Sequence, residues 1–236
     1  MPSGTDAQAG VPLSRAFPKR CFDLVGAVFG LLLFSLPFFL FALLVKLTST
    51  GPIFYRGTRA GRFGRPFRIF KFRSMVTDAE NLGGSSTAGG DPRLTRVGRL
   101  MRKYKLDELP QLINVLLGQM SFVGPRPEVP RYVETYRGEE TEILEVRPGI
   151  TDWASIWNAD EGAVLAGTED PDKAYEELIR PTKLRLQLKY VREMSLMTDV
   201  KIIVYTALKI VRRNWLPKEL AEYGRLQDGP GAEESN

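Results

Sequence analysis

The longest apolar run in this chain limits what it can fold into. Residues 24–45 form 22 consecutive positions without a charged side chain. As a helix, such a run rises about 33 Å, close to the ~30 Å thickness of a bilayer core. It is longer than the apolar part of a secretory signal, and residues 46–50 after it offer no small-x-small cleavage site. The sequence therefore predicts a membrane-embedded segment rather than a cleaved leader.

Pro37 lies near the middle of this run, where it removes one helical hydrogen bond and clashes with the preceding turn. The hydroxyl of Ser35 can bond to backbone freed by such a break. Because positive charge marks the cytoplasmic side, similar charge on both flanks favours a re-entrant helix that returns to the same face. An ordinary kinked span is the alternative, and Asp23 is expected in the interface beside Lys19 or Arg20. The flanking cations are Arg15, Lys19 and Arg20 before the run, and Lys46, Arg56, Arg59, Arg62 and Arg65 after it.

Two features of the composition restrict the chemistry. The chain has no histidine and one cysteine, Cys21, which excludes a histidine-based nucleophile system, an intrachain disulfide and a cysteine-rich zinc site. A metal ion would be a hard one such as Mg²⁺, held by carboxylate oxygens. Residues 56–105 hold thirteen Lys/Arg against three Asp/Glu, whereas residues 134–180 hold thirteen acids against four bases. A basic block beside an apolar segment predicts partners that carry phosphate groups.

Regular structure is expected around this basic block and after it. Residues 53–55 and 67–72 are strand-like and predict a β-hairpin. Residues 93–109 predict an amphipathic helix with arginines on one face, which Pro110 ends or kinks. Residues 121–130 and 147–149 are rich in proline and glycine and predict irregular loops. Further helices are expected at 111–117, 132–145, 172–193 and 199–213, the last amphipathic enough to lie either at a membrane surface or in the core.

The adjacent carboxylates Asp107 and Glu108 follow the arginine-rich helix directly. An acidic pair on a helix is most often a solvated face. Close to so much positive charge, however, both carboxylates are expected to be ionised with lowered pKa values. That state suits a nucleophile or a Mg²⁺ ligand better than a neutral acid.

Two cationic elements accompany the acidic pair. Arg126 lies between two prolines that fix its direction, as binding a phosphate with two parallel hydrogen bonds requires. In residues 70–73, strand alternation would place Lys71 and Arg73 on one side and two phenylalanines on the other. A rigid turn with a surface arginine and an exposed polar strand are the corresponding alternatives.

Four stretches carry a resemblance to a known family. They are residues 70–75 (FKFRSM), 106–112 (LDELPQL), 120–127 (MSFVGPRP) and 146–151 (VRPGIT). In this order, together with the apolar segment, they resemble the monotopic phosphoglycosyl transferases, also called the bacterial sugar transferase family. The resemblance runs from about residue 19 to residue 213.

The resemblance implies a reaction and a location. It implies transfer of a sugar-1-phosphate from a UDP-sugar to polyprenyl (undecaprenyl) phosphate, with UMP and a polyprenyl-diphosphate sugar as products. The family mechanism has a covalent aspartyl-phosphosugar intermediate, uses Mg²⁺ and begins the assembly of glycans such as capsule or O-antigen. The expected location is the bacterial inner membrane, among its lipids, with the catalytic domain on the cytoplasmic face.

By motif position, Asp107 is implied as the nucleophile and as a Mg²⁺ contact, and Glu108 as a metal partner or base. Lys71, Arg102 and Arg126 match cationic positions of the family site, and Arg147 matches the motif near the nucleotide. The chain departs from the family pattern at two places. Leu36 separates Ser35 from Pro37, which the family commonly has adjacent, and Asp152 stands where the family often has glycine.

The expected fold class is α+β and mostly helical, with a re-entrant broken membrane helix and a small cytosolic catalytic domain that contains a β-hairpin and interfacial amphipathic helices. Residues 15–50 would form the membrane hairpin and residues 51–225 the catalytic domain, in which 152–184 is a variable region that shapes the sugar pocket. Disorder is expected in residues 1–14 and 226–236. A membrane-tethered nucleic-acid binder and a scaffold for glycan assembly are the alternatives. Nucleic acid is not expected as a partner, because no recognised binding module is present, and the oligomeric state stays open, a homodimer included.

Overall fold

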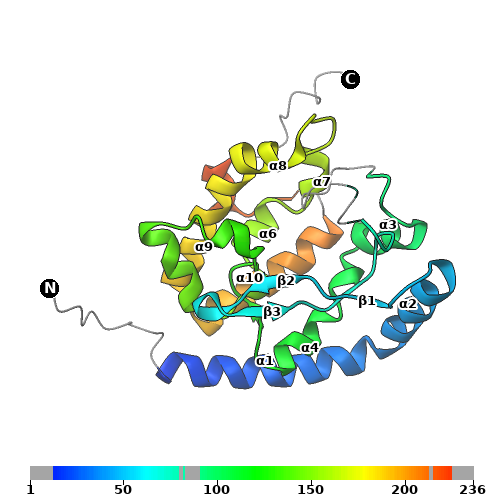
Figure 1. Cartoon of the computed structure of the whole chain (residues 1–236). Coiled ribbons are helices and arrows are strands. Elements are labelled where there is room, and N and C mark those ends of the chain that lie inside the picture. The colour runs from blue at the N-terminus through cyan, green and yellow to red at the C-terminus, as the bar shows by residue number, and fades with distance from the viewer. Residues whose placement is uncertain (1–12, 80–81, 83–90, 213–214, 225–236) are drawn as a thin grey trace, which may run out of the picture.

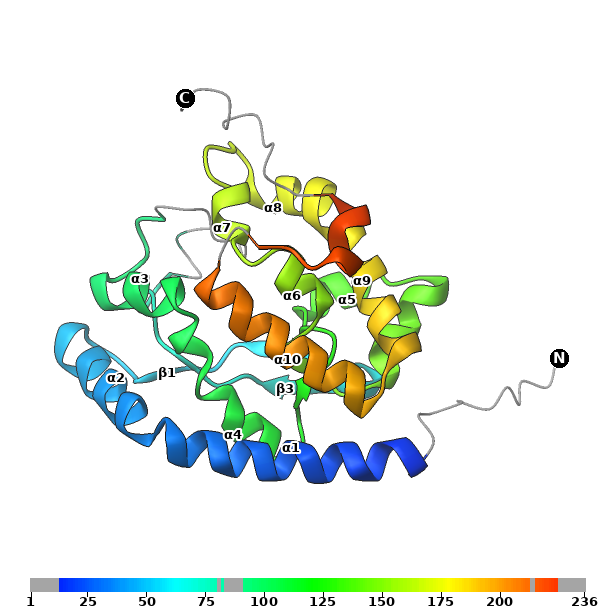
Figure 2. The same ribbon diagram turned by 180° about the vertical axis from the view of Figure 1, so that it is seen from behind.

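The computed structural model describes residues 13–79, 82, 91–212 and 215–224. The two terminal segments expected to be disordered lie almost wholly outside these residues. Two helices form one edge of the molecule: α1 (Leu13–Leu33) runs along it, and α2 (Ser35–Thr48) turns away at its end (Figure 1). Helix α4 (Gln111–Leu116) lies against α1, while α7 (Glu161–Val164) and α8 (Pro171–Ala174) lie at the opposite edge of the molecule (Figures 1 and 2).

The apolar run is broken at Phe34, between α1 and α2. The two helices meet at an angle of 65°, and together they pass as a bent candidate membrane segment, whereas no single helix of the described residues does so. Pro37 is the third residue of α2, where a missing N–H leaves no helical bond unmade. The break expected near Pro37 is present three residues earlier, at Phe34, directly before Ser35.

Each half of the bent pair packs one face against the rest of the chain. Ala27 of α1 is buried with Phe67 and Ile69, and Phe41 of α2 packs with Phe72. The opposite faces remain apolar and exposed, so burial of these helices within the chain is one-sided. The exposed residues include Val25, Phe29, Leu32, Leu36, Phe39, Leu43 and Leu47.

The expected hairpin is present as two short antiparallel ladders. Strand β1 (Phe54–Tyr55) pairs with β4 (Lys71–Phe72), and β2 (Thr58–Ala60) pairs with β3 (Pro66–Arg68). A single-turn 3-10 segment, η1 (Arg62–Gly64), closes the tip. The hairpin prediction is confirmed, and it places the end of β4 next to the acidic pair.

The helix expected over residues 93–109 is only partly formed. Helix α3 (Arg96–Lys103) begins at the N-cap Thr95, whose hydroxyl accepts from the Gly98 N–H at 2.9 Å. The chain then turns at Lys105, which has a φ of 57°, and enters the 3-10 segment η2 (Leu106–Glu108). The prediction of one continuous helix was wrong, because the left-handed conformation of Lys105 changes the direction of the chain before the carboxylates. Helix α4 (Gln111–Leu116) follows Pro110 as expected.

The two proline- and glycine-rich loops contain a pair of strands that the sequence did not indicate. Strand β5 (Ser121–Val123) pairs in parallel with β6 (Gly149–Thr151). The chains approach so closely beyond β5 that a Cβ on Gly149 would lie 2.1 Å from the Gly124 nitrogen. Only glycine fits there, so glycines that predicted irregular loops instead permit strand pairing.

The C-terminal half forms the largest core. The helix expected over 132–145 is replaced by α5 (Pro130–Val133) and the 3-10 segment η3 (Gly138–Glu145), because Gly138, the first residue of η3, takes a φ of 55°. The expected helix over 172–193 is confirmed as α8 (Pro171–Ala174), the π segment η4 (Tyr175–Ile179) and α9 (Arg180–Glu193). The remaining elements are α6 (Trp153–Trp157), α7 (Glu161–Val164), α10 (Leu196–Val211) and η5 (Lys218–Tyr223).

Helix α10 crosses one side of the molecule (Figure 2) and packs in the core, one of the two roles considered for it. Ile202 is fully buried in a core cluster with Trp153 and Tyr190. Its other face is apolar and exposed at Leu196, Met197, Val200, Val204, Ile210 and Val211. The helix is therefore a core element that also presents an apolar stripe.

Candidate active site

Glu108 lies at the centre of the cationic residues that the sequence singled out. Arg126 donates to it twice, from Nη1 to Oε2 at 2.8 Å and from Nη2 to Oε1 at 2.6 Å. Lys71 donates to the same Oε1 at 3.1 Å. The structure thus brings together three predicted site residues, which come from η2, the end of β5 and β4.

Local structure aims each of these side chains. Lys71 pairs in register with Tyr55 in the antiparallel ladder, which fixes its direction. Arg126 follows β5 between two prolines, and its Nη1 also donates to the Ile150 carbonyl at 2.5 Å. Its guanidinium is therefore fastened to both Glu108 and strand β6, as expected of a pre-aimed arginine.

The Asp107 carboxylate is buried beside this cluster, with 5% of the residue exposed. Its Oδ1 has no hydrogen-bond partner among the described residues. Burial raises the pKa of Asp107, and the nearby charge of Lys71 offsets only part of this effect. The expectation that Asp107 has a lowered pKa was therefore wrong, because desolvation of this side chain outweighs its cationic neighbours.

For Glu108 the balance is reversed. Burial by itself would raise the pKa of this carboxyl, but Arg126 and Lys71 together hold it well below its ordinary value of 4.5. Burial lowers the pKa of Lys71 despite the attraction of Glu108. The two adjacent carboxylates thus differ, one fully paired and ionised, the other desolvated and short of partners.

Arg102 and Arg147 occupy different places around the site. Arg102 donates from Nε to the Ser74 hydroxyl at 2.9 Å, and its charge acts on Asp107. Arg147 donates instead to the Gly118 carbonyl at 2.9 Å, beyond the end of α4. Burial and the charge of Arg147 lower the pKa of Arg62, which places these two arginines close together. Arg147 is therefore grouped with other arginines and not with the Glu108 cluster.

The two cations expected on one side of a strand also separate. Lys71 reaches Glu108, whereas Arg73 is buried and donates to the Ser49 and Thr50 carbonyls after α2. The alternation ends because β4 is only two residues long. Arg73 thereby fastens the end of the bent helix pair to the strands instead of entering the site.

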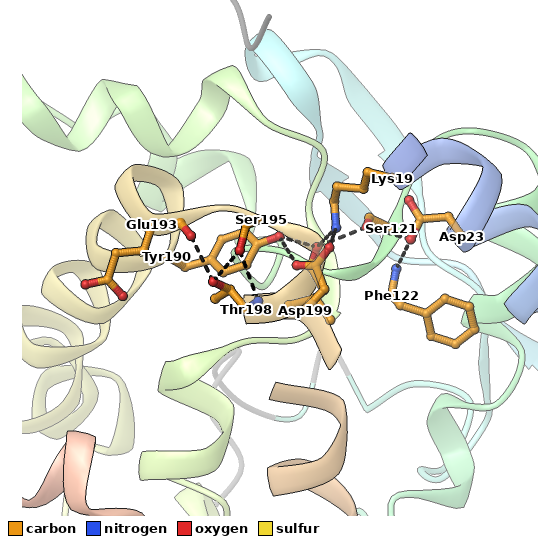
Figure 3. A network of polar contacts seen from close by, with 10 residues as sticks. Lys19, Asp23, Ser121, Phe122, Tyr190, Glu193, Ser195, Thr198 and Asp199 are labelled. Carbon is orange, nitrogen blue, oxygen red and sulfur yellow. Dashed lines mark hydrogen bonds and ion pairs between the residues drawn. The ribbon is translucent and has the colours of Figure 1, made fainter. Parts of the chain in front are cut away.

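A buried polar network that the sequence did not indicate joins α1 to β5, α9 and α10 (Figure 3). Lys19 pairs with Asp199 and donates to the Val123 carbonyl at 3.0 Å, and Tyr190 donates to Asp199 at 2.8 Å. The available signal was Asp199, the only acidic residue in the amphipathic stretch of residues 196–211. Such a residue is costly to bury unless it is paired.

Asp23 was expected in a membrane interface and is instead buried at the same junction. Its Oδ1 accepts from the Ser121 hydroxyl at 2.9 Å and from the Phe122 N–H at 3.1 Å (Figure 3). Helix α1 packs closely on β5, which encloses the Asp23 carboxylate and supplies both donors to it.

No group of three or more Asp, Glu, His or Cys side chains lies together in the described part of the chain. A Mg²⁺ ion commonly keeps one or two carboxylates and takes its other ligands from substrate phosphates and water. The unpartnered oxygen of Asp107 fits that arrangement, whereas both oxygens of Glu108 are already bonded to cations. The site can thus bind an anionic ligand and offers one carboxylate oxygen to a metal ion or to a reacting atom.

Comparison with known proteins identifies the family. The chain matches the family model described as bacterial sugar transferase over residues 14–213. It belongs to this family, as the four motifs indicated.

Several relatives have recorded activities. The chain is 38% identical over 199 residues to a UDP-N-acetylgalactosamine-undecaprenyl-phosphate N-acetylgalactosaminephosphotransferase of Aeromonas hydrophila, covering 83% of the chain and 44% of that protein. It is 40% identical over 200 residues to a UDP-glucose:undecaprenyl-phosphate glucose-1-phosphate transferase of Escherichia coli, covering 81% of the chain and 39% of that protein. The chain thus spans less than half of these two relatives. The chain is also 36% identical over 203 residues to the exopolysaccharide production protein PSS of Rhizobium leguminosarum. This match covers 83% of the chain and 96% of that protein.

Proposed function

We propose that this protein transfers a sugar-1-phosphate from a UDP-sugar to undecaprenyl phosphate or a similar polyprenyl phosphate, which yields UMP and a polyprenyl-diphosphate sugar. Two relatives are named for reactions of this kind, with UDP-sugar donors and undecaprenyl phosphate as acceptor. The single observation that carries the proposal is the buried, unpartnered oxygen of Asp107 beside the Glu108 cation cluster.

The reaction takes two displacements at phosphorus. A carboxylate oxygen of Asp107 attacks the β-phosphorus of the donor, and the bond from that phosphorus to the bridging oxygen breaks, so UMP leaves with the electron pair. The lipid phosphate then attacks the same phosphorus, and the acyl phosphate bond breaks to restore the Asp107 carboxylate. Each step replaces one phosphorus–oxygen bond with another, so no oxidant or reductant is needed.

Arg126 stabilises the charge that develops in these steps. Glu108 and Ile150 take three of its five N–H donors, which among the described residues leaves two for a donor phosphate. Lys71 adds a second cation at the same carboxylate. Fixed cations of this kind, in place before reaction, stabilise developing negative charge.

Mg²⁺ is proposed as the metal, with Asp107 as its protein ligand. When bound, it would neutralise charge on the diphosphate of the donor. The role proposed for Glu108 differs from the one that the family resemblance implied. Its bonds to Arg126 and Lys71 orient those cations, so it positions the phosphate-binding groups rather than acting as a metal partner or a base.

The bent helix pair is proposed to be re-entrant. Its first half is fastened to the catalytic part of the chain by Lys19, and its far end by Arg73 through Ser49 and Thr50. A helix held at both ends by one folded unit keeps both ends on one side of a bilayer. Together with the apolar stripe of α10, the exposed faces of α1 and α2 would then enter the cytoplasmic leaflet of the inner membrane.

UMP release decides the reaction. The purified protein would be incubated with polyprenyl phosphate, Mg²⁺ and a panel of UDP-sugars in turn. We expect one or a few donors to yield UMP, and Asp107→Asn to abolish the release without loss of folding or membrane association. Full activity in Asp107→Asn would refute the covalent route. A scaffold would release no UMP from any donor.

Topology has a separate test. In a Cys21→Ala background, cysteines at Phe17 and Thr58 would be labelled with a membrane-impermeant reagent. Both positions should react only when the cytoplasmic side is accessible. Reaction of the two from opposite sides would make the bent pair a spanning helix.

A further inference from the structure

Asp152 lies at the end of β6 and is fully buried. One of its oxygens, Oδ1, caps helix α6 by accepting from the Ser155 N–H at 2.7 Å and from the Ser155 hydroxyl at 2.6 Å. Its other oxygen, Oδ2, turns away from α6 and accepts from the Arg126 N–H at 3.1 Å and from Gln187 Nε2 at 3.2 Å. A helix cap uses only the first oxygen, so the second has another role.

The second oxygen holds the backbone of the arginine in the site. Pro125 and Pro127 have no N–H, so Arg126 carries the only backbone donor of this three-residue segment. That donor is taken by Asp152, and the Arg126 carbonyl accepts from Gln187 Nε2 at 3.3 Å. Both polar groups of the Arg126 main chain are therefore bonded to two fully buried side chains.

These two side chains come from outside the four motifs. Asp152 follows the last motif directly, and Gln187 lies on α9, which packs with α6 around the largest core. The charge of Asp152 also acts on Arg126, as a second carboxylate besides Glu108. The placement of the guanidinium is thus tied to the packing of α6 and α9.

We propose that Asp152 and Gln187 are positioning residues, which hold the main chain of Arg126 so that its guanidinium meets Glu108 and the donor phosphate together. The expected effect of these two residues on the reaction rates rests on the proposed function, whereas their role in holding the Arg126 main chain does not. Loss of the Oδ2 acceptor should leave α6 capped and let Arg126 move.

Two exposed aspartates provide matched controls. Asp160 caps α7 through the Ala163 N–H at 3.1 Å, and Asp170 caps α8 through the Asp172 N–H at 3.0 Å. Both are helix caps in residues 152–184, and neither is bonded to Arg126. If Asp152 acted only as a helix cap, replacing Asp152, Asp160 or Asp170 by asparagine should therefore have the same effect on Arg126.

The decisive variant is Asp152→Asn. Asparagine keeps an oxygen for the Ser155 cap but turns an NH₂ group toward the Arg126 N–H and Gln187, where two donors would meet. We expect kcat for UMP release to fall about tenfold or more, the rate equivalent of one charge-assisted hydrogen bond, with KM for the UDP-sugar changed less. The control variants are Asp160→Asn and Asp170→Asn, whose capping oxygens do not contact Arg126.

A second measurement does not depend on activity. The rate at which butanedione modifies Arg126, followed by peptide mass spectrometry, should rise in Asp152→Asn and stay at the wild-type value in the two control variants. Gln187→Met leaves the α6 cap intact and should give a smaller rise in the Arg126 modification rate. If Asp152→Asn does not fold, Gln187→Met serves as the test variant instead. An unchanged modification rate in a folded variant would overturn the proposal. Absence of UMP release from the wild type would refute the proposed function alone, since the modification rates would still decide the role of Asp152.

Discussion

Lys19 and Asp199 lie 180 positions apart in the sequence and form a buried ion pair, with the lysine Nζ 2.6 Å from the aspartate Oδ2. The pair joins the start of α1 to α10, and Lys19 also bonds the last residue of β5, three positions before Arg126. The attachment of the apolar helix α1 and the placement of Arg126 therefore both depend on strand β5.

Removing one member of this pair should destabilise the protein strongly. Lys19→Met leaves the Asp199 charge buried with Tyr190 as its one remaining side-chain donor among the described residues, which should cost about 3–5 kcal/mol of unfolding free energy. The double variant Lys19→Met/Asp199→Leu should recover much of this loss, because no unpaired charge remains. Denaturant unfolding in detergent measures both. The exposed Lys46→Met at the end of α2 is the control and should stay within about 0.5 kcal/mol of the wild type. Equal effects at Lys19 and Lys46 would show that the ion pair contributes nothing.

The two adjacent carboxylates should respond oppositely to neutralisation. Asp107→Asn should lower UMP release at least about a thousandfold, as loss of a nucleophile does, with stability unchanged or higher. Glu108→Gln should lower stability by about 3–5 kcal/mol, because Arg126 and Lys71 lose their shared partner. Thermal unfolding and UMP release, measured on the same preparations, separate the two effects. Similar stability losses in both variants would contradict the assigned roles.

The raised pKa of Asp107 should limit the rate at acid pH. Burial favours the protonated form, which cannot attack phosphorus, so kcat/KM should fall as pH falls through a pKa above the ordinary 3.8. Glu108 stays ionised over this range because its pKa is lowered. A pH–rate profile should thus show a single acid limb. A midpoint at or below 3.8 would contradict the burial of Asp107.

The same two groups affect stability with opposite signs. Because the folded pKa of Asp107 is raised, its contribution is fully present below pH 3.8 and is lost as pH rises through the folded value. For Glu108, whose pKa is lowered, the contribution is present above pH 4.5 and is lost only as pH falls through the folded value. Asp107→Asn should therefore flatten the decline in unfolding free energy just above pH 3.8.

Much of the site could be predicted because its signals are local. The charge density around residues 105–110, the prolines around Arg126 and the cations of residues 70–73 predicted that Glu108, Arg126 and Lys71 share one site. The turn at Lys105 could not be predicted, because a left-handed lysine is unfavourable alone and only tertiary contacts hold it there. The pairing of β5 with β6 joins segments 26 or more positions apart and has no local signature.

The surroundings of the two carboxylates, and not their residue type, determine the direction of their pKa shifts. A lowered pKa was expected for both carboxylates from their cationic neighbours, but burial reversed the direction for Asp107. Asp152 was visible only as a departure from the family pattern, and its bond to Arg126 depends on how α6 and α9 pack. Sequence patterns thus predicted that Lys71, Glu108 and Arg126 meet, but they also placed Arg73 and Arg147 at the site, where the structure does not have them. Packing determined the protonation and support of the residues that do meet.

Two buried amides on α4 offer a final contrast. Gln111 and Asn114 are both fully buried, yet neither amide atom of Gln111 has a hydrogen-bond partner in the described part of the chain. Asn114 accepts from the Phe70 N–H at 2.8 Å and donates to the Arg68 carbonyl at 3.0 Å. An unsatisfied buried amide costs about 1–3 kcal/mol, whereas a satisfied one stabilises the fold.

Gln111→Met should therefore raise the unfolding free energy by about 1–3 kcal/mol, because methionine fills a similar volume without polar atoms. Asn114→Leu should lower it by a similar amount, since it removes the partners of Arg68, at the end of β3, and of Phe70, between β3 and β4. Denaturant unfolding of both variants checks the signs. Gln111 lies four positions after Asp107, so UMP release is measured as well. A more stable but slower Gln111→Met would show that the amide is kept unpaired for substrate, whereas a less stable variant would show that water or a side-chain rearrangement already satisfies it.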